Sequence, residues 1–150
     1  MIIWIDADAC PRPAKDIIFR AGERMSLSVR VVANKAMFVP SSELISMIQV
    51  PGGADVADDY IVAHAARGDI AITSDIPLAA RLVERSIVVL SSSGDEYDSE
   101  NIRERLSVRD FMTDLRDTGV MTGGPKAYGE KEKRRFAAAL DRALARARSR

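Results

Sequence analysis

The sequence has little of several residue types, and each scarcity excludes a class of protein. A single cysteine, Cys10, in 150 residues rules out a framework of intramolecular disulfides, and a single histidine, His64, leaves no usual Cys/His zinc site. The 22 basic and 22 acidic residues cancel to a formal net charge of zero, which excludes a uniformly basic nucleic-acid binder. Aromatic residues make up only 5% of the chain, so a platform of stacking rings for single-stranded nucleic acid is not expected.

Long apolar runs are also missing. None approaches the length of a bilayer span, and Asp6 and Asp8 lie where a signal peptide would need its apolar stretch. We therefore expect a protein of the reducing cytoplasm with no membrane association. The chain does contain 47% hydrophobic residues, which is enough at 150 residues for the core of one compact domain over residues 1–150.

Short apolar runs alternate with segments of helical spacing. Residues 2–5 form an uninterrupted β-branched and aromatic run, which is typical of a strand buried on both faces. Further strands are expected at 29–33, 70–73 and 87–90, and helices at about 11–25, 55–67, 77–83, 99–117 and 130–148. Ser41 to Glu43 is expected to open another short helix, which carries Leu44, Ile45 and Ile48. The alternation predicts a three-layer α/β domain with a C-terminal helical extension over about 99–150.

Aspartates follow the expected strands at the edge where an open parallel sheet binds its ligands. Asp6 and Asp8 follow the first strand, and Asp75 follows the strand at 70–73. Three more acids open the helix expected at 55–67, with i, i+3, i+4 spacing that places them on one face: Asp55, Asp58 and Asp59. The sequence therefore predicts one cluster of carboxylates.

Two interpretations of this cluster remain open. Ionised carboxylates about 4 Å apart repel each other by about 4 kcal/mol at an effective dielectric near 20, so a cluster needs a counter-charge or shared protons. Oxygen ligands favour Mg²⁺ or Mn²⁺, and such an ion supports phosphodiester cleavage by activating water. The alternative is helix capping, which suits Asp55, Asp58 and Asp75 and extends to Asp8. Capping does not explain Asp6 at the end of the first strand.

Four separate motifs occur in an order that is found in one bacterial family. They are Asp6-Ala7-Asp8-Ala9-Cys10-Pro11, Ala54-Asp55-Val56-Ala57-Asp58-Asp59, Gly68-Asp69 through Thr73-Ser74-Asp75-Ile76-Pro77-Leu78-Ala79, and Thr122-Gly123-Gly124-Pro125. Together they resemble the YaiI/YqxD family, and the resemblance covers nearly the whole chain. That family is similar to PIN-like domains, which have a nuclease-type α/β/α fold. The resemblance therefore implies a PIN-like domain with a mostly parallel central sheet and a metal-dependent nuclease activity.

The resemblance also implies roles for individual acids. In PIN-type nucleases an Asp ends the first strand, an acid begins a middle helix in a pattern like D-x-x-I-x-x-x-A, and a T-x-D follows a later strand. Asp6, Asp58 and Asp75 match these three positions. Asp8 and Asp55 are additional to the simplest pattern and could supply a further carboxylate. Which of the three acids at 55, 58 and 59 faces the ion is left open.

A second resemblance concerns the first strand alone. The segment IIWIDADAC resembles the first motif of haloacid-dehalogenase-type phosphatases, in which the first Asp attacks phosphorus. Those enzymes also need a lysine and an acidic pair after the threonine of their second motif. No lysine occurs between Thr73 and Lys126, which makes this phosphatase chemistry the less favoured alternative.

Two reactive residue types are interpreted as structural. Cys10 stands at a helix start, where a thiol pKa can fall, but its two neighbouring aspartates would raise that pKa. Its Pro-rich surroundings also leave no room for an anion-binding loop. His64 lies on the apolar side of its expected helix, so we expect it in the core.

The charge is unevenly distributed along the chain. Residues 126–150 contain nine lysines and arginines against three acids, a net charge of +6, which leaves −6 on residues 1–125. A basic helix of this kind could hold the phosphate backbone of RNA or DNA. Alternatively, it simply docks on an acidic body through Phe136, Leu140 and Leu144.

The sequence therefore predicts a Mg²⁺- or Mn²⁺-dependent phosphodiesterase that acts on RNA. The alternative from another class is a non-catalytic RNA- or protein-binding module that uses its acids as caps. The predicted catalytic acids, which also bind metal directly or through water, are Asp6, Asp8, Asp58 and Asp75, with Asp55 and Asp59 as further metal ligands. The predicted substrate contacts are Asn34, Thr73, Ser74, Lys126 and Arg134.

Overall fold

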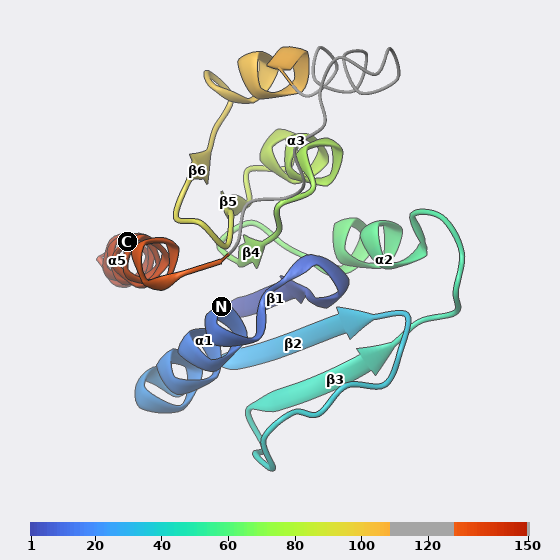
Figure 1. The fold of residues 1–150 in the computed structure, drawn as a ribbon, viewed down its shortest axis with the longest axis vertical. Helices are drawn as coiled ribbons and strands as arrows, with labels where there is room; N and C mark the ends of the chain where they lie inside the picture. Colours follow the sequence, from blue (N-terminus) through green and yellow to red (C-terminus); the bar gives the residue numbers. More distant parts are fainter. Residues whose placement is uncertain (109–127, 150) are drawn as a thin grey trace.

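The computed structural model describes residues 1–108 and 128–149. At its centre is a six-stranded sheet in the order β3-β2-β1-β4-β5-β6 (Figure 1). All neighbouring strands pair in parallel except β6, which pairs antiparallel to β5. The strands are β1 (Ile2–Asp6), β2 (Ser28–Ala33), β3 (Ile45–Gln49), β4 (Ile70–Ile72), β5 (Val88–Leu90) and β6 (Glu96–Tyr97).

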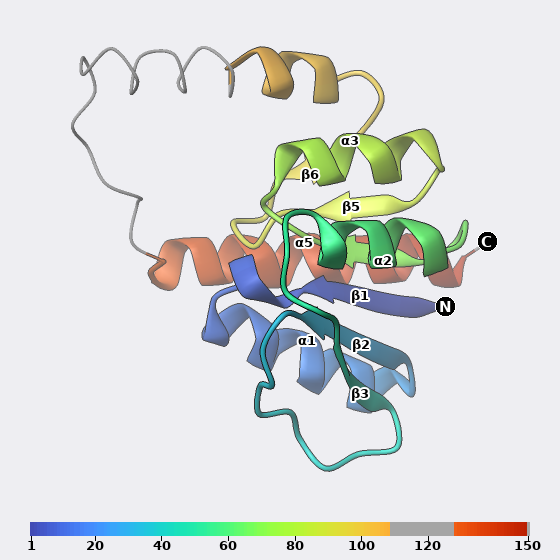
Figure 2. The same ribbon diagram turned by 90° about the vertical axis from the view of Figure 1, so that its right-hand side faces the viewer.

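Helices cover both faces of this sheet. The helices are the 3₁₀ turn η1 (Ala7–Ala9), α1 (Arg12–Met25), α2 (Val56–His64), α3 (Ile76–Glu84) and α5 (Glu130–Arg148). The first core cluster joins α1 and α5 to one face, and the second joins α2 and α3 to the other (Figures 1 and 2). The three-layer α/β/α architecture and the mostly parallel sheet predicted from the sequence are therefore confirmed.

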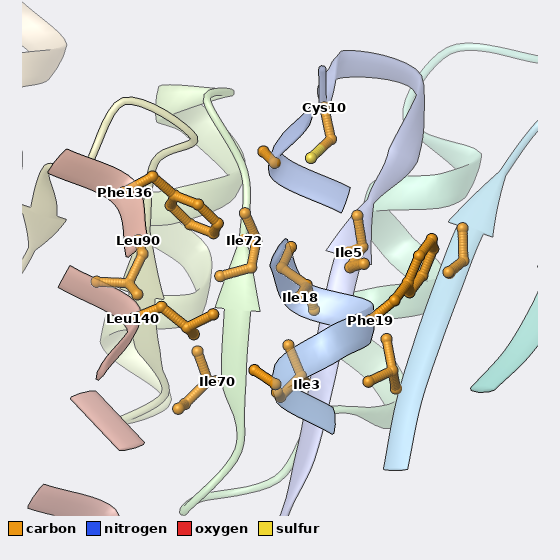
Figure 3. Packing of buried hydrophobic residues seen from close by; sticks show 14 of the residues in the cluster. Ile3, Ile5, Cys10, Ile18, Phe19, Ile70, Ile72, Leu90, Phe136 and Leu140 are labelled. Carbon is orange, nitrogen blue, oxygen red and sulfur yellow. The ribbon is translucent and has the colours of Figure 1, made fainter. Parts of the chain in front are cut away.

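The alternation of β1 side chains explains why its sequence is apolar throughout. Ile3 and Ile5 contribute to the cluster under α1 and α5 (Figure 3), whereas Trp4 contributes to the cluster under α2 and α3. All three side chains are at most 3% exposed. A strand with helices on both faces has no solvent-facing positions, so it lacks the polar alternation of an edge strand. The expectation for residues 2–5 is confirmed.

A buried carboxylate holds the start of β1 against the start of β4. Asp69 is 6% exposed and accepts three hydrogen bonds. The donors are the backbone N–H of Ile2 at 3.0 Å, the indole N–H of Trp4 at 3.0 Å and the backbone N–H of Ala66 at 2.9 Å. A buried charge needs such partners, and together they fix the edge of the sheet opposite to the ends of β1 and β4.

The prediction of a helix after Ser41 is wrong. Residues Ile45–Gln49 form strand β3 instead, which pairs in parallel with β2. The backbone groups along the outer side of β2 need partners, and an apolar segment with two isoleucines suits a pleated, half-buried surface. Strand pairing therefore overrides the weak helical spacing. The short β6 also had no counterpart among the expected strands.

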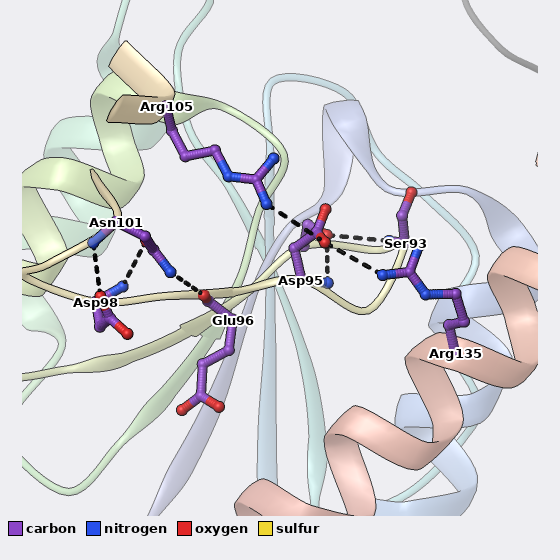
Figure 4. Close-up of polar contacts among 8 residues, drawn as sticks. Ser93, Asp95, Glu96, Asp98, Asn101, Arg105 and Arg135 are labelled. Carbon is purple, nitrogen blue, oxygen red and sulfur yellow. Dashed lines mark hydrogen bonds and ion pairs between the residues drawn. The ribbon is translucent and has the colours of Figure 1, made fainter. Parts of the chain in front are cut away.

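The basic C-terminal helix docks through its apolar side. Phe136, Leu140 and Leu144 are at most 1% exposed and belong to the same cluster as α1 (Figure 3). Two ion pairs add to this contact. Arg135 reaches Asp95 at 3.4 Å (Figure 4), and Arg146 reaches Glu96 at 2.7 Å. The docking interpretation is confirmed, while five cations of α5 form no ion pair with a described residue: Lys131, Lys133, Arg134, Arg142 and Arg148.

One glycine makes the close approach to α5 possible. Gly94 has a φ of +93°, and a Cβ atom built on it would lie 2.7 Å from backbone atoms of Arg135. Only a residue without a side chain fits both conditions at low cost. The turn at residues 91–94 therefore serves as a contact with the helix.

Three predictions extend beyond the described residues. Residues 102–108 are helical, residues 99–101 form a turn before them, and residues 109–117 of the helix predicted at 99–117 lie outside the described part of the chain. The Thr122–Pro125 motif and Lys126 lie outside it as well. Within residues 1–108 and 128–149, no helix combines the length and hydropathy that crossing a membrane requires.

Candidate functional site

The chain changes direction at β1, and this brings distant segments to one edge of the sheet. After β1 the chain builds β2 and β3 on one side, and then returns to build β4 and β5 on the other side. Figure 2 shows the ends of the parallel strands at the same edge as η1 and the starts of α1, α2 and α3. Open α/β sheets bind ligands at such a topological switch point, because the two sets of loops diverge there and leave a crevice.

A cavity of about 230 Å³ lies at this edge, and we call it the acid cavity. It is lined by Asp6, Asp8, Ala9, Asn34, Gly53, Asp55, Ala57, Asp58 and Asp75. Five of the six acids that the sequence singled out therefore come together, along with one predicted substrate contact. No lysine or arginine of the described chain lines the cavity. The sixth acid, Asp59, does not line it and instead pairs with Arg81 at 2.8 Å.

Thr73 connects the acids at the ends of β1 and β4. Its hydroxyl donates to Oδ2 of Asp6 at 2.8 Å and accepts from the backbone N–H of Asp75 at 3.0 Å. Thr73 is only 3% exposed and Asp6 only 6%, so the hydroxyl holds one carboxylate oxygen of Asp6 from the interior. The other oxygen of Asp6 forms no hydrogen bond with a described residue. The threonine predicted as a substrate contact is thus placed behind Asp6, in a positioning role.

Asp8 and Asn34 meet between η1 and the end of β2. The backbone N–H of Asn34 donates to Oδ2 of Asp8 at 3.1 Å. The side-chain oxygen of Asn34 is buried and has no hydrogen-bond partner among the described residues. An unpaired buried acceptor costs free energy, and an ionised carboxylate such as that of Asp8 cannot donate a hydrogen bond to it. A cation or an ordered water is the kind of partner that this oxygen lacks.

The capping interpretation holds for one acid and fails for another. Oδ1 of Asp75 accepts from the backbone N–H of Leu78 at 3.0 Å, so Asp75 caps α3 as that interpretation predicts. Asp55 stands at the N-cap position of α2, but its side chain forms no capping hydrogen bond. Its backbone is left-handed, with φ 63° and ψ 8°, a conformation that is costly for a residue with a Cβ atom. Capping therefore does not account for Asp55.

The crowding of carboxylates changes their pKa values. Burial raises the pKa of Asp6, and the nearby Asp75 and Asp8 raise it further, against a lowering by the Thr73 hydrogen bond. The pKa of Asp58 is raised to about 6, first by burial and then by Asp75, Asp6 and Asp55. Arg81 lowers the pKa of Asp58, but this arginine is already paired with Asp59. The cavity thus carries excess negative charge without a compensating cation of its own.

The side-chain arrangement limits how a metal ion could be held. Among the residues that the structure describes, no three His, Cys, Asp or Glu side chains are arranged to hold one ion together. Mg²⁺ commonly uses only one or two protein carboxylates and keeps several waters. The polar side chains that line the acid cavity are five carboxylates and the amide of Asn34, and their oxygens are the ligand type that such a hydrated ion accepts, directly or through water.

Comparison with known proteins shows where the chain belongs. The family model described as "Uncharacterized BCR, YaiI/YqxD family" matches residues 4–146. The chain belongs to the YaiI/YqxD family. It is 54% identical to a UPF0178 protein of Bordetella petrii over 144 residues, covering 96% of both chains. It is 51% identical to a UPF0178 protein of Myxococcus xanthus over 146 residues, covering 97% of this chain and 95% of the relative. No solved structure matches the chain.

The family motifs and the acid cavity overlap. Three of the four motifs that carry the YaiI/YqxD resemblance supply cavity-lining acids, from the segments at 6–11, 54–59 and 73–79. Gly53, next to the second of these motifs, also lines the cavity and has a φ of +141°. Only glycine adopts this conformation without strain, so the turn before α2 depends on it.

Several predicted residues lie elsewhere in this YaiI/YqxD chain. Ser74 is exposed beside the cavity and its hydroxyl contacts that of Ser92 at 3.2 Å. Arg134 is exposed on α5 and does not line the acid cavity. The expectation that His64 is a core residue is wrong, because it is exposed and its ring stacks on Tyr60 with centroids 4.0 Å apart. The helix ends at His64, so its last turn reaches solvent.

Cys10 has the structural role that the sequence indicates. Its thiol is buried under the α1 side of the sheet (Figure 3). Burial raises the pKa of the Cys10 thiol to about 12, with Asp6 adding to the effect and Lys15 opposing it. The thiol therefore stays protonated at neutral pH and is a poor nucleophile.

Asp58→Asn is expected to stabilise the YaiI/YqxD fold in the absence of divalent cations. Above pH 6 the wild-type carboxylate is ionised although it is partly buried, and its neighbours repel it. Asparagine avoids both costs. We expect about 1 kcal/mol, less than the full pKa shift implies because Asp58 is partly solvated. The gain should disappear as the pH falls through 6 toward 3.8, where Asp58 becomes protonated in both folded and unfolded states. Urea unfolding in EDTA at a series of pH values measures it.

The matched control for this variant is Asp59→Asn, one residue away on the same helix. Asp59 lies outside the acid cavity and forms an exposed ion pair with Arg81, so its replacement should give no stabilisation at any pH. Equal stabilisation by both variants would mean that general surface charge, and not crowding in the acid cavity, raises the free energy of the native state.

Proposed function

We propose that this protein is a Mg²⁺- or Mn²⁺-dependent phosphodiesterase that cleaves RNA in the acid cavity. The observation that carries the proposal is the convergence of five aspartates, from segments far apart in the sequence, on one cavity that Asn34 also lines. Structural carboxylates are normally paired with a cation or a set of amides, as Asp69 is. Excess negative charge from carboxylates in a cavity favours the binding of a divalent cation.

In three of the carboxylates, one oxygen is held by a hydrogen bond and the other is free to bind metal. Thr73, the Leu78 amide and the Asn34 amide each hold one oxygen of Asp6, Asp75 and Asp8, respectively. The second oxygen of each carboxylate remains available, and these three acids with the side chain of Asn34 would hold the ion directly or through water. When bound, the ion would activate water and stabilise negative charge on the phosphate. Because one oxygen of each carboxylate is held by a hydrogen bond, the other oxygen is already oriented before substrate binds.

Asp58 is suited to accept the proton of the attacking water. Its pKa of about 6 lies close to neutral pH, where a general base combines a substantial ionised fraction with useful basicity. Asp55, exposed at the N-cap of α2 with no capping bond, is available as a further donor at the cavity mouth. The PIN-like resemblance points to the same three acids, Asp6, Asp58 and Asp75.

RNA as the substrate is supported by the cations outside the cavity. The five cations of α5 without an ion pair among the described residues offer contacts for a phosphate backbone. Binding that depends on them should weaken steeply as salt increases. Arg134, at the start of α5, remains a proposed substrate contact on this basis.

The test is cleavage of end-labelled single-stranded RNA by the purified full-length chain. We expect products on a denaturing gel when Mn²⁺ or Mg²⁺ is added, none in EDTA, and slower cleavage of a DNA strand of the same sequence. A well-folded preparation that cleaves neither strand with either ion would exclude the nuclease and leave the binding module.

A further inference from the structure

A second cavity lies beside the acid cavity, and it is built from a different kind of side chain. It has a volume of about 330 Å³ between the start of α1 and the loop that follows β2. We call it the Phe38 cavity. Its lining consists of two cations, one acid and mainly apolar residues: Arg12, Lys15, Asp16, Phe19, Met37, Phe38 and Pro40.

Phe38 is unusually exposed for a large apolar side chain. Its exposure is 85%, whereas the other large hydrophobic residues exposed in the described chain, Met1 and Val108, are at 41% and 48%. The loop around it is nevertheless attached to the body of the protein. Nζ of Lys15 lies 3.7 Å from Sδ of Met37, and Phe19 beneath is only 7% exposed. The loop therefore holds the ring of Phe38 in solvent, next to buried side chains. This exposure of apolar surface costs free energy unless a ligand covers the ring.

The charges at this cavity favour an anionic ligand. Arg12 and Lys15 form no ion pair with any described residue, although Asp16 lines the same cavity. Both cations belong to the first turn of α1, where the helix dipole adds positive potential. A ligand with a flat apolar ring and a nearby negative group matches this combination of an aromatic face and unpaired cations.

The Phe38 cavity is connected to the acid cavity by two short segments. Asn34 lines the acid cavity, and Phe38 follows it by four residues, a span of at most about 14 Å. Asp8 lines the acid cavity as well, and Arg12 follows it by four residues. Figure 2 shows the loop after β2 leaving the same edge at which η1 and α1 begin. A polymer that enters one cavity thus passes beside the other.

We infer that the Phe38 cavity binds one nucleobase of a single-stranded RNA next to the phosphate that is cleaved. This inference rests on the proposed function for the class of its ligand. The ring of Phe38 stacks on the base, and the side chains of Arg12 and Lys15 contact an adjacent phosphate. The low aromatic content predicts no platform of several rings, and a single exposed ring suffices for one base.

The test is binding of a short fluorescein-labelled oligoadenylate to the full-length chain in EDTA, measured by fluorescence anisotropy. Removing a stacking side chain weakens nucleic-acid binding by about 5- to 100-fold, so Phe38→Ala should raise Kd within that range. Phe38→Trp should retain wild-type affinity. Val108→Ala is the matched control, since it truncates another exposed apolar side chain away from the cavity and should leave Kd unchanged.

A second ligand separates base stacking from phosphate contact. An oligomer of the same length that lacks its bases should bind wild-type protein about as weakly as oligoadenylate binds Phe38→Ala. In Phe38→Trp, oligoadenylate should quench fluorescence of the new indole, because the native Trp4 is only 3% exposed and lies out of reach. Equal binding of the two oligomers to wild type would overturn the inference. So would an unchanged Kd for Phe38→Ala, including the case in which this variant instead dissociates a dimer.

These measurements need neither metal nor turnover, so they test the nucleobase site separately from the proposed phosphodiesterase activity. RNA that binds through Phe38 but is never cleaved would refute the phosphodiesterase and leave the nucleobase site. Metal-dependent cleavage with an unchanged Kd for Phe38→Ala would refute the nucleobase site and leave the phosphodiesterase.

Discussion

Replacing Asp6 and Asp75 together by asparagine is expected to lower the rate of Mn²⁺-dependent RNA cleavage by at least ~100-fold, the scale on which metal sites depend on their ligands and the groups that orient them. Asparagine keeps the shape of both side chains. Its amide oxygen still accepts from the Thr73 hydroxyl at position 6 and from the Leu78 amide at position 75. What disappears is the negative charge that the ion requires, so the loss should be chemical and not structural.

The stability of this double variant decides how the loss is interpreted. Removing two mutually repelling charges should leave the free energy of unfolding in EDTA unchanged or raise it, as measured by urea denaturation. Asp59→Asn serves as the control. Asp59 pairs with Arg81 outside the acid cavity, so this variant should cleave RNA at the wild-type rate. A folded double variant with undiminished cleavage would place the chemistry elsewhere.

Asp69→Ala is expected to lower the free energy of unfolding by about 3 kcal/mol, the range for breaking a buried, charge-assisted hydrogen-bond set. The substitution leaves three donors without their acceptor: the backbone N–H groups of Ile2 and Ala66 and the indole N–H of Trp4. For a chain of this length the midpoint of thermal unfolding should fall by about 6 to 12 °C. Differential scanning calorimetry measures both quantities.

Two comparisons make the Asp69 result specific. Asp16→Ala removes an exposed aspartate with no side-chain partner among the described residues, and we expect a change within about 0.5 kcal/mol. Asp69 lies at the edge of the sheet opposite to the acid cavity, so the cleavage rate well below the unfolding midpoint should stay at the wild-type value. A loss of stability under 1 kcal/mol would mean that water replaces the carboxylate at little cost.

The fold could be predicted largely because its signals are strong and local. The apolar run at β1 shows no polar alternation, which is the expected result of helices on both faces, and α5 begins and ends at the residues that its amphipathic spacing indicates. Strand β3 was missed because its identity depends on pairing with β2. A helical spacing of Leu44, Ile45 and Ile48 carries no information about a partner strand 12 or more residues away.

The sequence could predict that the acids meet at one edge of the sheet, but not the direction in which each side chain points. The acids after β1 and β4 had to meet once both strands were placed in parallel, because parallel strands end at one edge of the sheet. The spacing of Asp55, Asp58 and Asp59 could not tell which one turns to Arg81, since that depends on the packing of α2 against α3. The bridging role of Thr73 and the exposure of Phe38 depend likewise on tertiary contacts that no local pattern records.

The central proposal is that the acid cavity holds a divalent cation, directly or through water, and a crystal soaked in Mn²⁺ tests it most directly. We expect a single strong anomalous peak between the free carboxylate oxygens of Asp6 and Asp75, with water completing the coordination and the Asn34 oxygen directed toward it. A soaked crystal with no anomalous density in the cavity, and with the acids of the cavity bonded only to their own backbone amides, would contradict it.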